Sequence, residues 1–298
     1  MKIFYYFLFL VWYLLSLLPL WFLYGISDLI YFPLYYLVRY RRRIVRKNLV
    51  ESFPEKSEEE IIRIEKDFYH FFGDYIMETI KLFSMSEKQM RKRMTFGGIE
   101  EVNRCLETRN CIIYLGHYCN WEWVSSLPLY LGKEVVPGQI YHALENEAFN
   151  DLFLRLRGRF GAVNIEMMSA LRQLVQYKRD SKRFVVGFIA DQAPNWDYIH
   201  FWTDFLNHKS AVFTGAERIA KSVNAVVVYL DITRVRRGYY HAEFVKMADT
   251  PKAVPEYELT VDYARHLERT IRRAPQYWLW SHNRWKRTHE EYLRRQQS

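Results

Sequence analysis

The pattern of apolar and polar residues divides the chain into an apolar N-terminal stretch and a longer region of mixed character. Residues 3–24 contain no charged side chain and are almost wholly apolar. A helix of that length can cross the hydrocarbon core of a bilayer. Lys2 precedes the stretch and no small-residue cleavage site follows it, so the pattern predicts an uncleaved membrane helix rather than a signal peptide. A buried core helix of a soluble protein is the alternative interpretation.

The apolar character continues through residues 26–38, a tyrosine-rich segment that an aspartate and a proline interrupt. We expect this segment to span, to re-enter or to lie on the membrane, because tyrosine favours the interface. Residues 39–47 then bring a cluster of arginine and lysine without any acid. Beside a membrane segment, such a cluster predicts the cytoplasmic side and contact with an anionic membrane surface. The chain is therefore expected to divide into a membrane anchor over 1–38 and a cytoplasmic domain over 39–298.

Helical and strand periodicities alternate along the rest of the chain. Ser57 and Glu60 form a capping box at the start of an amphipathic helix predicted over 58–81. Beyond residue 96, short β-branched runs alternate with amphipathic segments, which favours an α/β fold with a mostly parallel sheet flanked by helices. Strands are expected at 111–115, 135–141, 184–190 and 225–231, with an edge strand at 240–246, and helices near 121–131, 145–159, 167–179, 213–222 and 256–273.

Composition narrows the classes of partner. Lysine and arginine number 43 against 34 acidic residues, which gives a formal charge of +9, and aromatic residues make up 17% of the chain. Such a chain suits nucleic acid, an anionic membrane or acidic small molecules, and the apolar N-terminus favours the membrane over nucleic acid. The three cysteines lack zinc-binding spacing, so we expect reduced thiols, no metal site, and Cys119 as a small packed residue rather than a nucleophile.

The candidate chemistry begins at the end of the first of these strands. Residues 111–115 are followed by Gly116, then by His117 and, five positions later, by Glu122. The two side chains can meet if His117 lies on the loop and Glu122 lies in the first turn of a helix that Asn120 caps. The pattern predicts an imidazole oriented by the Glu122 carboxylate, which is half of a catalytic triad without its serine.

Two further loops are expected at the same edge of the sheet, where α/β proteins bind ligands. One follows strand 135–141 and leads into the helix that carries Arg157. The other follows strand 184–190 and begins with Asp191 and Gln192. These side chains are candidates for substrate binding, although a solvated helix face and an ordinary Asx turn would explain them as well.

Several segments together resemble a known family. His117 and Glu122, after an apolar strand and a glycine, resemble the His-x4-acid motif of the lysophospholipid acyltransferase superfamily. The resemblance covers nearly the whole chain. Three further segments narrow it to the lipid A late acyltransferase branch, the lauroyl/myristoyl transferase-like family: Ala190-Asp191-Gln192, Phe205-Leu206 with Thr214-Gly215, and the tail over 275–286.

The resemblance implies an enzyme of glycerolipid acyltransferase-like fold at the bacterial inner membrane, with its catalytic domain facing the cytoplasm. It implies transfer of a fatty acyl chain from an acyl carrier protein thioester, or from coenzyme A, to a hydroxyl of a lipid A precursor or related glycolipid, without a cofactor. His117 would act as the general base and Glu122 would orient it. The residues implied in substrate binding are Arg157, Asp191, Gln192 and Asn120.

Two departures from the family pattern leave other acceptors open. Asn207 replaces a usual glycine, and Asn283 replaces the first arginine of a usual His-Arg-Arg. The lost cation favours a less phosphorylated acceptor, such as an aminoacyl lipid or a lysophospholipid. A non-catalytic lipid-binding protein of the same fold is a third hypothesis, but it would not need both His117 and Glu122. The tryptophans and cations over 280–286 are interpreted as an interfacial belt.

Overall fold

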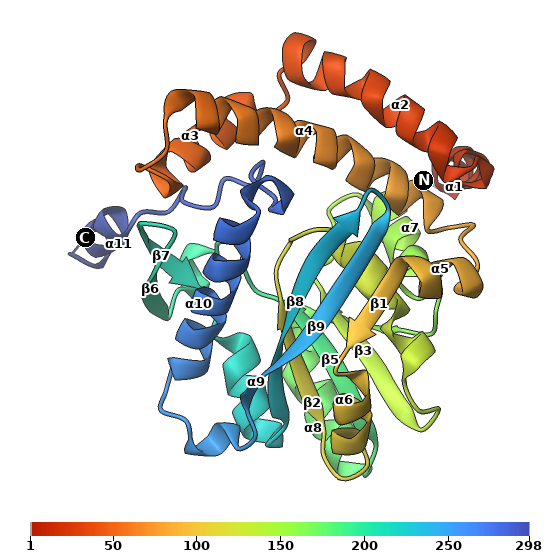
Figure 1. Ribbon diagram of the computed structural model, residues 1–298. Helices are drawn as coiled ribbons and strands as arrows, with labels where there is room; N and C mark the ends of the chain where they lie inside the picture. The colour runs from red at the N-terminus through yellow and green to blue at the C-terminus, as the bar shows by residue number, and fades with distance from the viewer. Residues whose placement is uncertain (1, 298) are drawn as a thin grey trace.

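The computed structural model describes residues 2–297 and places seven strands in one sheet (Figure 1). Their order is β1-β9-β8-β2-β5-β3-β4. The strands from β8 to β4 run parallel, whereas β9 is antiparallel to β8 and β1 is parallel to β9. The predicted α/β fold with a mostly parallel sheet is confirmed. The strands are β1 (Met94–Gly97), β2 (Cys111–Leu115), β3 (Val135–Tyr141), β4 (Val163–Glu166), β5 (Arg183–Ile189), β8 (Val226–Arg236) and β9 (Tyr239–Ala248), with a separate hairpin of β6 (Phe201–Phe205) and β7 (His208–Val212).

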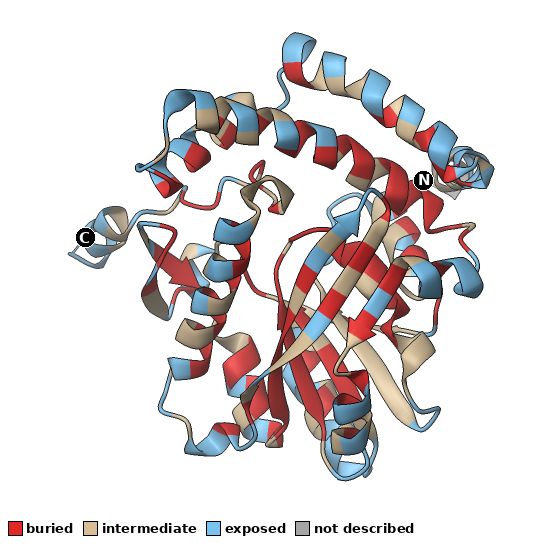
Figure 2. Ribbon diagram, in the orientation of Figure 1, coloured by how far each residue is buried: buried red, intermediate tan, exposed pale blue. Residues whose placement is uncertain are grey.

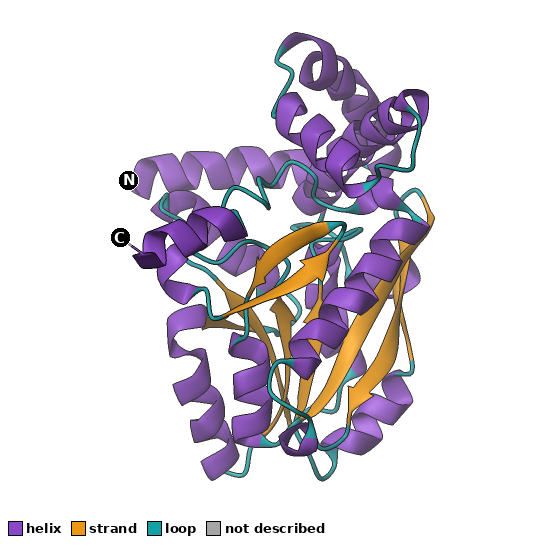
Figure 3. Cartoon of the chain, turned by 90° about the vertical axis from the view of Figure 1, so that its left-hand side faces the viewer, coloured by secondary structure: helices purple, strands orange, loops and turns teal. Residues whose placement is uncertain are grey.

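Helices cover both sides of this sheet (Figure 1, Figure 3). Every residue of β2 is buried, and so are most residues of β5 and the first half of β8 (Figure 2). Strands covered on both faces carry apolar side chains in both directions, which accounts for their uninterrupted apolar runs. The helices beyond the N-terminal region are α3 (Arg42–Ser52), α4 (Glu58–Lys81), α5 (Glu87–Arg93), α6 (Ile99–Leu106), η2 (Trp121–Tyr130), α7 (Glu147–Arg157), η3 (Met167–Ser169), α8 (Ala170–Arg179), η4 (Trp196–Tyr198), α9 (Gly215–Val223), η5 (Pro251–Ala253), α10 (Glu258–Arg273), η6 (Pro275–Tyr277) and α11 (His289–Gln297).

The predicted strand positions agree with the structure at the centre of the sheet and differ at its margins. β2 and β3 have the expected bounds, and β5 and β8 begin one residue away from them. The prediction that β9 is an edge strand is wrong, because β1 pairs with its outer side from Met94 to Gly97. β1 and β4 have four residues each, which is too few to show a periodicity in the sequence.

The N-terminal apolar stretch forms two helices instead of the predicted single one. α1 (Lys2–Leu17) and α2 (Leu20–Phe32) meet at a break before Pro19, and a π-helical turn, η1 (Pro33–Leu37), continues α2. Proline disfavours helical conformation in the residue before it, which explains the break at Leu18. Among the described residues, no single helix is long and apolar enough to cross a bilayer, whereas one pair, these two segments bent by 114° at the break, meets that requirement together.

α2 packs closely against α4, which crosses above the carboxyl ends of the central strands (Figure 1). The buried Ser27 hydroxyl on α2 donates to Asp74 Oδ1 on α4 at 2.8 Å. Gly73 permits this approach, because a Cβ there would lie 2.8 Å from Ser27 Oγ and 3.3 Å from the Ser27 carbonyl oxygen. Arg234, near the end of β8, and Arg237, in the turn between β8 and β9, also bind Asp74. α2 is therefore fixed to the sheet as well as to α4.

Replacing Gly73 with leucine should separate α2 from α4, because the new side chain would overlap Ser27. We expect Gly73→Leu to lower the free energy of unfolding by about 2 kcal/mol or more. Gly25 on α2 is the matched control, since no heavy atom lies within 4 Å of a Cβ built there. Gly25→Ala should instead raise the stability by roughly 0.5–1 kcal/mol through its higher helix propensity. Denaturant unfolding in detergent measures both, and equal stability of Gly73→Leu and wild type would contradict the close packing.

Candidate active site

The register of two neighbouring strands brings the candidate site together. β2 and β5 pair in parallel with Leu115 opposite Ile189, so the residues two positions beyond each strand also lie side by side. These residues are His117 and Asp191. His117 Nδ1 lies 2.6 Å from Asp191 Oδ1, and the His117 backbone N–H donates to Asp191 Oδ2 at 2.9 Å. The imidazole is thus oriented by a carboxylate from the adjacent strand.

The surroundings of Asp191 fix its charge and the tautomer of the histidine. Burial alone would raise the pKa of Asp191, but the His117 charge and the hydrogen bonds from His117 and from Trp278 Nε1, at 2.7 Å, outweigh it and hold the pKa at about 2. An ionised carboxylate accepts hydrogen bonds and donates none. In the neutral imidazole, the proton between the two side chains therefore resides on His117 Nδ1, and Nε2 is the acceptor, 3.4 Å from the Gln192 amide nitrogen.

The predicted contact between His117 and Glu122 is wrong. Both Glu122 carboxylate oxygens accept hydrogen bonds from Arg157, at 2.8 Å from Nε and 2.6 Å from Nη2. The segment expected to be an α-helix is the 3-10 helix η2, and Cys119 before it has a left-handed φ of 51°. These two features turn Glu122 toward α7. The ring that packs edge-on against the imidazole is that of Trp121, with 5.2 Å between ring centroids.

Arg157 and Glu122 form a bidentate ion pair beside the histidine. The Glu122 side chain is buried, and the Arg157 side chain retains 26% of its surface exposed. Burial alone would lower the pKa of Arg157, but the adjacent Glu122 carboxylate outweighs burial and raises it. The guanidinium is therefore permanently charged, and two of its three nitrogens are directed at Glu122.

His117, Glu122 and Arg157 line one cavity of about 670 Å³, a volume within the range of small-molecule binding sites. The cavity is polar near the imidazole, where Gln192 Nε2 lies 3.4 Å from His117 Nε2. Farther in, it runs along the sheet and η2. Its apolar lining there includes Val124, Leu127, Ile140, Met168, Val185, Ile189 and Phe213. The arrangement places a general base at the polar end of an apolar cavity.

Of the four predicted substrate-binding residues, Arg157 and Gln192 line the cavity, whereas the buried Asn120 and Asp191 do not. The Asn120 side chain is fully buried. The expected N-cap is confirmed, because Asn120 Oδ1 accepts from the Trp123 backbone N–H at 3.1 Å. The Asn120 amide nitrogen donates to Glu78 on α4 at 2.7 Å and is therefore occupied. Contact between Asn120 and a substrate stays a prediction that this burial does not favour.

The C-terminal segment borders the site, and its interpretation as an interfacial belt is wrong. Trp278, Trp280 and Trp285 are buried. The segment pairs with the histidine loop through two backbone hydrogen bonds, Cys119 N–H to Tyr277 O at 2.9 Å and Leu279 N–H to His117 O at 3.1 Å. Trp278 is the site residue that sequence reasoning missed, because nothing local relates it to Asp191. The high tryptophan content of this segment is the sequence signal that could have pointed to Trp278.

Two titratable side chains near the site are held in their neutral form. Burial raises the pKa of the fully buried Cys119 thiol well above its usual value, so the interpretation of Cys119 as a packed residue is confirmed. Burial also lowers the pKa of His282 to about 4. The neutral His282 Nε2 accepts from the Ala193 N–H at 3.4 Å, which supports the loop that follows Asp191.

Comparisons with known proteins agree on one family. A family model described as bacterial lipid A biosynthesis acyltransferase matches residues 1–287. The chain is similar to the lipid A biosynthesis palmitoleoyltransferase of Escherichia coli (strain K12), with 24% identity over 265 residues that cover 83% of this chain and 79% of the relative. The lipid A biosynthesis acyltransferase of Shigella flexneri is similar with the same identity and coverage.

Because Asp191 is buried and ionised, the free energy of unfolding should decrease at acidic pH. Its pKa is lowered in the folded state from its usual 3.8 to about 2, so its contribution is complete above the usual pKa and is lost as the pH falls through the folded-state value. The difference in unfolding free energy between wild type and Asp191→Asn should therefore narrow by about 2 kcal/mol between pH 6 and pH 2. Denaturant unfolding at several pH values measures this, and parallel pH profiles for the two proteins would contradict it.

Proposed function

Because the chain belongs to the bacterial lipid A biosynthesis acyltransferase family, we propose that it moves a fatty acyl chain from an acyl carrier protein thioester to a hydroxyl of a lipid A precursor or related glycolipid. The family match makes the protein an acyltransferase. The observation that carries the finer proposal is the His117–Asp191 pair at the polar end of an apolar cavity. The cavity offers the acyl chain an apolar wall, and the pair offers the acceptor hydroxyl a base.

In the proposed reaction, the acceptor hydroxyl displaces Gln192 from His117 Nε2 and donates its proton there. The oxygen attacks the thioester carbonyl carbon, the carbon–sulfur bond breaks, and the imidazolium returns the proton to the leaving thiolate. Asp191 keeps Nδ1 protonated and stabilises the transient imidazolium, as the aspartate of a catalytic triad does. The Gln192 amide, freed from Nε2, is in reach of the developing oxyanion. General-base catalysis of this kind accounts for about 10²–10⁴ in rate.

The Glu122–Arg157 pair has a separate role in this proposal. Glu122 binds Nε and Nη2 of the guanidinium, and Arg157 also lines the cavity. A fixed guanidinium suits a phosphate, either that of the donor's phosphopantetheine arm or one on the acceptor. Glu122 would then act by holding Arg157 in place rather than by orienting His117.

The N-terminal region supports a membrane location. Trp21, Leu29 and Val38 expose 70% or more of their surface, and they belong to the bent apolar pair or follow it directly. Exposed apolar area of this kind is typical of a membrane-contacting face. We infer that the bent pair inserts into the cytoplasmic face of the bacterial inner membrane, which would deliver a lipid acceptor beside the site.

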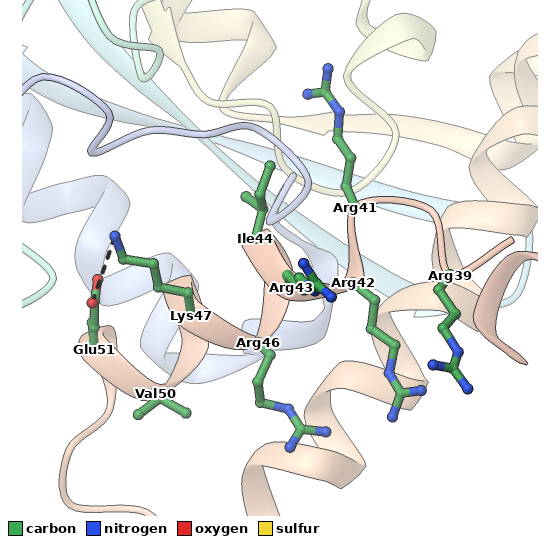
Figure 4. A pocket seen from close by; sticks show the side chains of 9 residues that line it. All are labelled: Arg39, Arg41, Arg42, Arg43, Ile44, Arg46, Lys47, Val50 and Glu51. Carbon is green, nitrogen blue, oxygen red and sulfur yellow. Dashed lines mark ion pairs between the residues drawn. The ribbon is translucent and has the colours of Figure 1, made fainter.

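A basic groove follows the apolar pair directly. It has a volume of about 940 Å³ and is lined by Arg39, Arg41, Arg42, Arg43, Arg46 and Lys47 of the segment around α3 (Figure 4). Arg42 and Arg46 both donate to the buried Glu65, and Lys47 pairs with Glu51, which also lines the groove, so these two carboxylates neutralise only part of the charge. The remaining cations support contact with anionic headgroups at about 1 kcal/mol each.

One observation favours a different acceptor. The exposed Asn283 stands where the family usually carries an arginine, so the surface beside the site has one cation fewer. An aminoacyl lipid or a lysophospholipid, which carries less phosphate, is the second candidate acceptor. The chemistry at His117 would be the same for each. A non-catalytic lipid-binding protein is disfavoured, because the chain belongs to a family of acyltransferases.

Replacement of the catalytic pair should abolish acyl transfer in folded protein. We expect His117→Ala to lower kcat about 10³-fold or more, and Asp191→Asn to lower it about 10⁴-fold because the tautomer is lost. Glu122→Gln should cause a smaller loss that appears mainly as a raised KM. Transfer of labelled acyl chains from acyl carrier protein to membrane lipid measures all three. His241→Ala on β9 is the control, and full activity of His117→Ala would refute the mechanism.

The acceptor can be identified by mass spectrometry of total membrane lipids from cells with and without the protein. We expect one lipid A species to lose an acyl chain when the protein is absent, and to regain it with wild type but not with His117→Ala. Loss of an acyl chain from an aminoacyl lipid or a phospholipid, with lipid A unchanged, would replace the first acceptor by the second.

A further inference from the structure

Three hydrogen bonds, two buried and one partly buried, converge on the Glu78 carboxylate of α4. The Tyr24 hydroxyl of α2 donates to Oε1 at 2.9 Å, and Oε2 accepts from the Asn120 amide nitrogen at 2.7 Å and from the Tyr240 hydroxyl of β9 at 2.7 Å. Glu78 has no exposed surface. Burying a carboxylate costs free energy unless hydrogen-bond donors replace the lost water. The three hydrogen bonds are therefore expected to stabilise one another.

Asn120 connects this cluster to the catalytic loop. It lies between His117 and Glu122 in the chain, and its Oδ1 caps η2 while its amide nitrogen binds Glu78. The Trp123 indole adds a second link, because its Nε1 donates to the Glu78 backbone oxygen at 3.1 Å. The first turn of η2 is therefore held to α4 at two points.

The loop needs such support because its backbone is strained. Cys119 adopts a φ of 51°, a left-handed conformation that a residue with a side chain keeps only when its surroundings impose it. Its neighbours on both sides are restrained: His117 by Asp191, and Asn120 by Glu78. Release of either restraint would allow the loop to relax away from the geometry that aims His117 at the cavity.

We propose that Tyr24 and Glu78 are positioning residues for the reaction, through which α2 holds the His117 loop in its active conformation. Tyr24 belongs to the bent apolar pair, so the segment expected only to anchor the protein is also part of the scaffold of the site. This role rests on the proposed acyl transfer. It assigns to Glu78 no contact with substrate, since the carboxylate is fully buried.

The test uses the full chain in lipid vesicles and two conservative variants. Tyr24→Phe removes one donor to Glu78 and keeps the ring. Glu78→Gln should preserve the cluster, because a glutamine can donate to the Tyr24 oxygen and still accept from Asn120 and Tyr240 through its own oxygen. Glu78→Ala, in contrast, leaves three donors without a partner. We therefore expect Glu78→Gln to behave like wild type, and the other two variants to loosen the loop.

The three cysteines report this loosening independently of activity. Cys119 lies in the loop and is fully buried, Cys111 lies in the buried strand β2, and Cys105 is partly exposed. Their alkylation by N-ethylmaleimide can be followed residue by residue by peptide mass spectrometry. Cys105 serves as the reference, and Cys111 reports general unfolding. In Tyr24→Phe, the rate at Cys119 should rise about tenfold while the rate at Cys111 stays unchanged, as expected for the loss of one hydrogen bond.

Kinetics and a matched control complete the design. We expect Tyr24→Phe to lower kcat about tenfold with KM for the acyl thioester unchanged. Tyr69→Phe is the control. The Tyr69 hydroxyl also links α4 to the N-terminal region, because it donates to Tyr40 O at 2.5 Å. Tyr69 lies on α4 well before Glu78, so its loss should not affect the Glu78 hydrogen bonds. Tyr69→Phe should leave both kcat and the rate at Cys119 at the wild-type level.

Each outcome decides between positioning and its alternatives. Wild-type alkylation of Cys119 in Tyr24→Phe would overturn the proposal, and a parallel rise at Cys111 would overturn it in favour of general destabilisation. A loosened loop with unchanged kcat would also overturn it. If wild type itself transfers no acyl chain while Cys119 responds as expected, the coupling of α2 to the loop is supported and the proposed reaction is refuted.

Discussion

The Asp191 carboxylate joins three parts of the chain that are remote in sequence. It accepts from the His117 side chain, from the His117 backbone and from Trp278, so the ends of β2 and β5 and the C-terminal segment meet at one group. A buried carboxylate must find donors or lose its charge. Satisfying Asp191 therefore requires that the sheet register, the histidine loop and the tail all be in place, and the same requirement fixes the imidazole tautomer.

The same constraint recurs elsewhere in the protein. Glu65, Asp74, Glu78 and Glu122 are all buried, and each has partners on other elements. Removing one partner of a buried ion pair leaves an uncompensated charge, which lowers the stability strongly. Replacing the whole pair by well-packed apolar residues changes the stability much less. These carboxylates thus specify which helices lie where, and the apolar core supplies most of the stability. α4 carries three of them and connects the N-terminal helices to the site.

Local patterns in the sequence predicted local structure well. The bounds of β2, which is an uninterrupted apolar run, of β3 and of α4, which begins with a capping box, were predicted correctly, because apolar runs and caps act within a few residues. His117 and Asp191 were also identified, since both follow strand ends, whereas Trp278 was missed. Their pairing was not predicted. Spacing along the chain favoured Glu122 as the partner of His117, whereas the partner comes from the next strand, and strand order depends on contacts between distant segments.

The predictions of a single N-terminal helix and of an interfacial belt in the C-terminal segment were wrong for related reasons. A single helix was predicted from the length of the apolar stretch, and the signal of Pro19 was given too little weight. A proline can end a helix within any apolar run. The tryptophan-rich composition of the C-terminal segment is typical of a membrane interface, but its tryptophans lie in the protein core. Composition says which solvent a side chain prefers, and the protein interior and the bilayer are similar solvents for tryptophan.

The pairing of the tail with the histidine loop has a consequence for biosynthesis. Ribosomes deliver a chain from its N-terminus, so α1 and α2 emerge first, and the segment that supplies Trp278, Tyr277 and Leu279 emerges after every strand of the sheet. Until then Asp191 lacks its indole donor and the histidine loop lacks its partner strand. The N-terminal helices are therefore made long before the His117–Asp191 pair can be completed, because that pair needs nearly the whole chain.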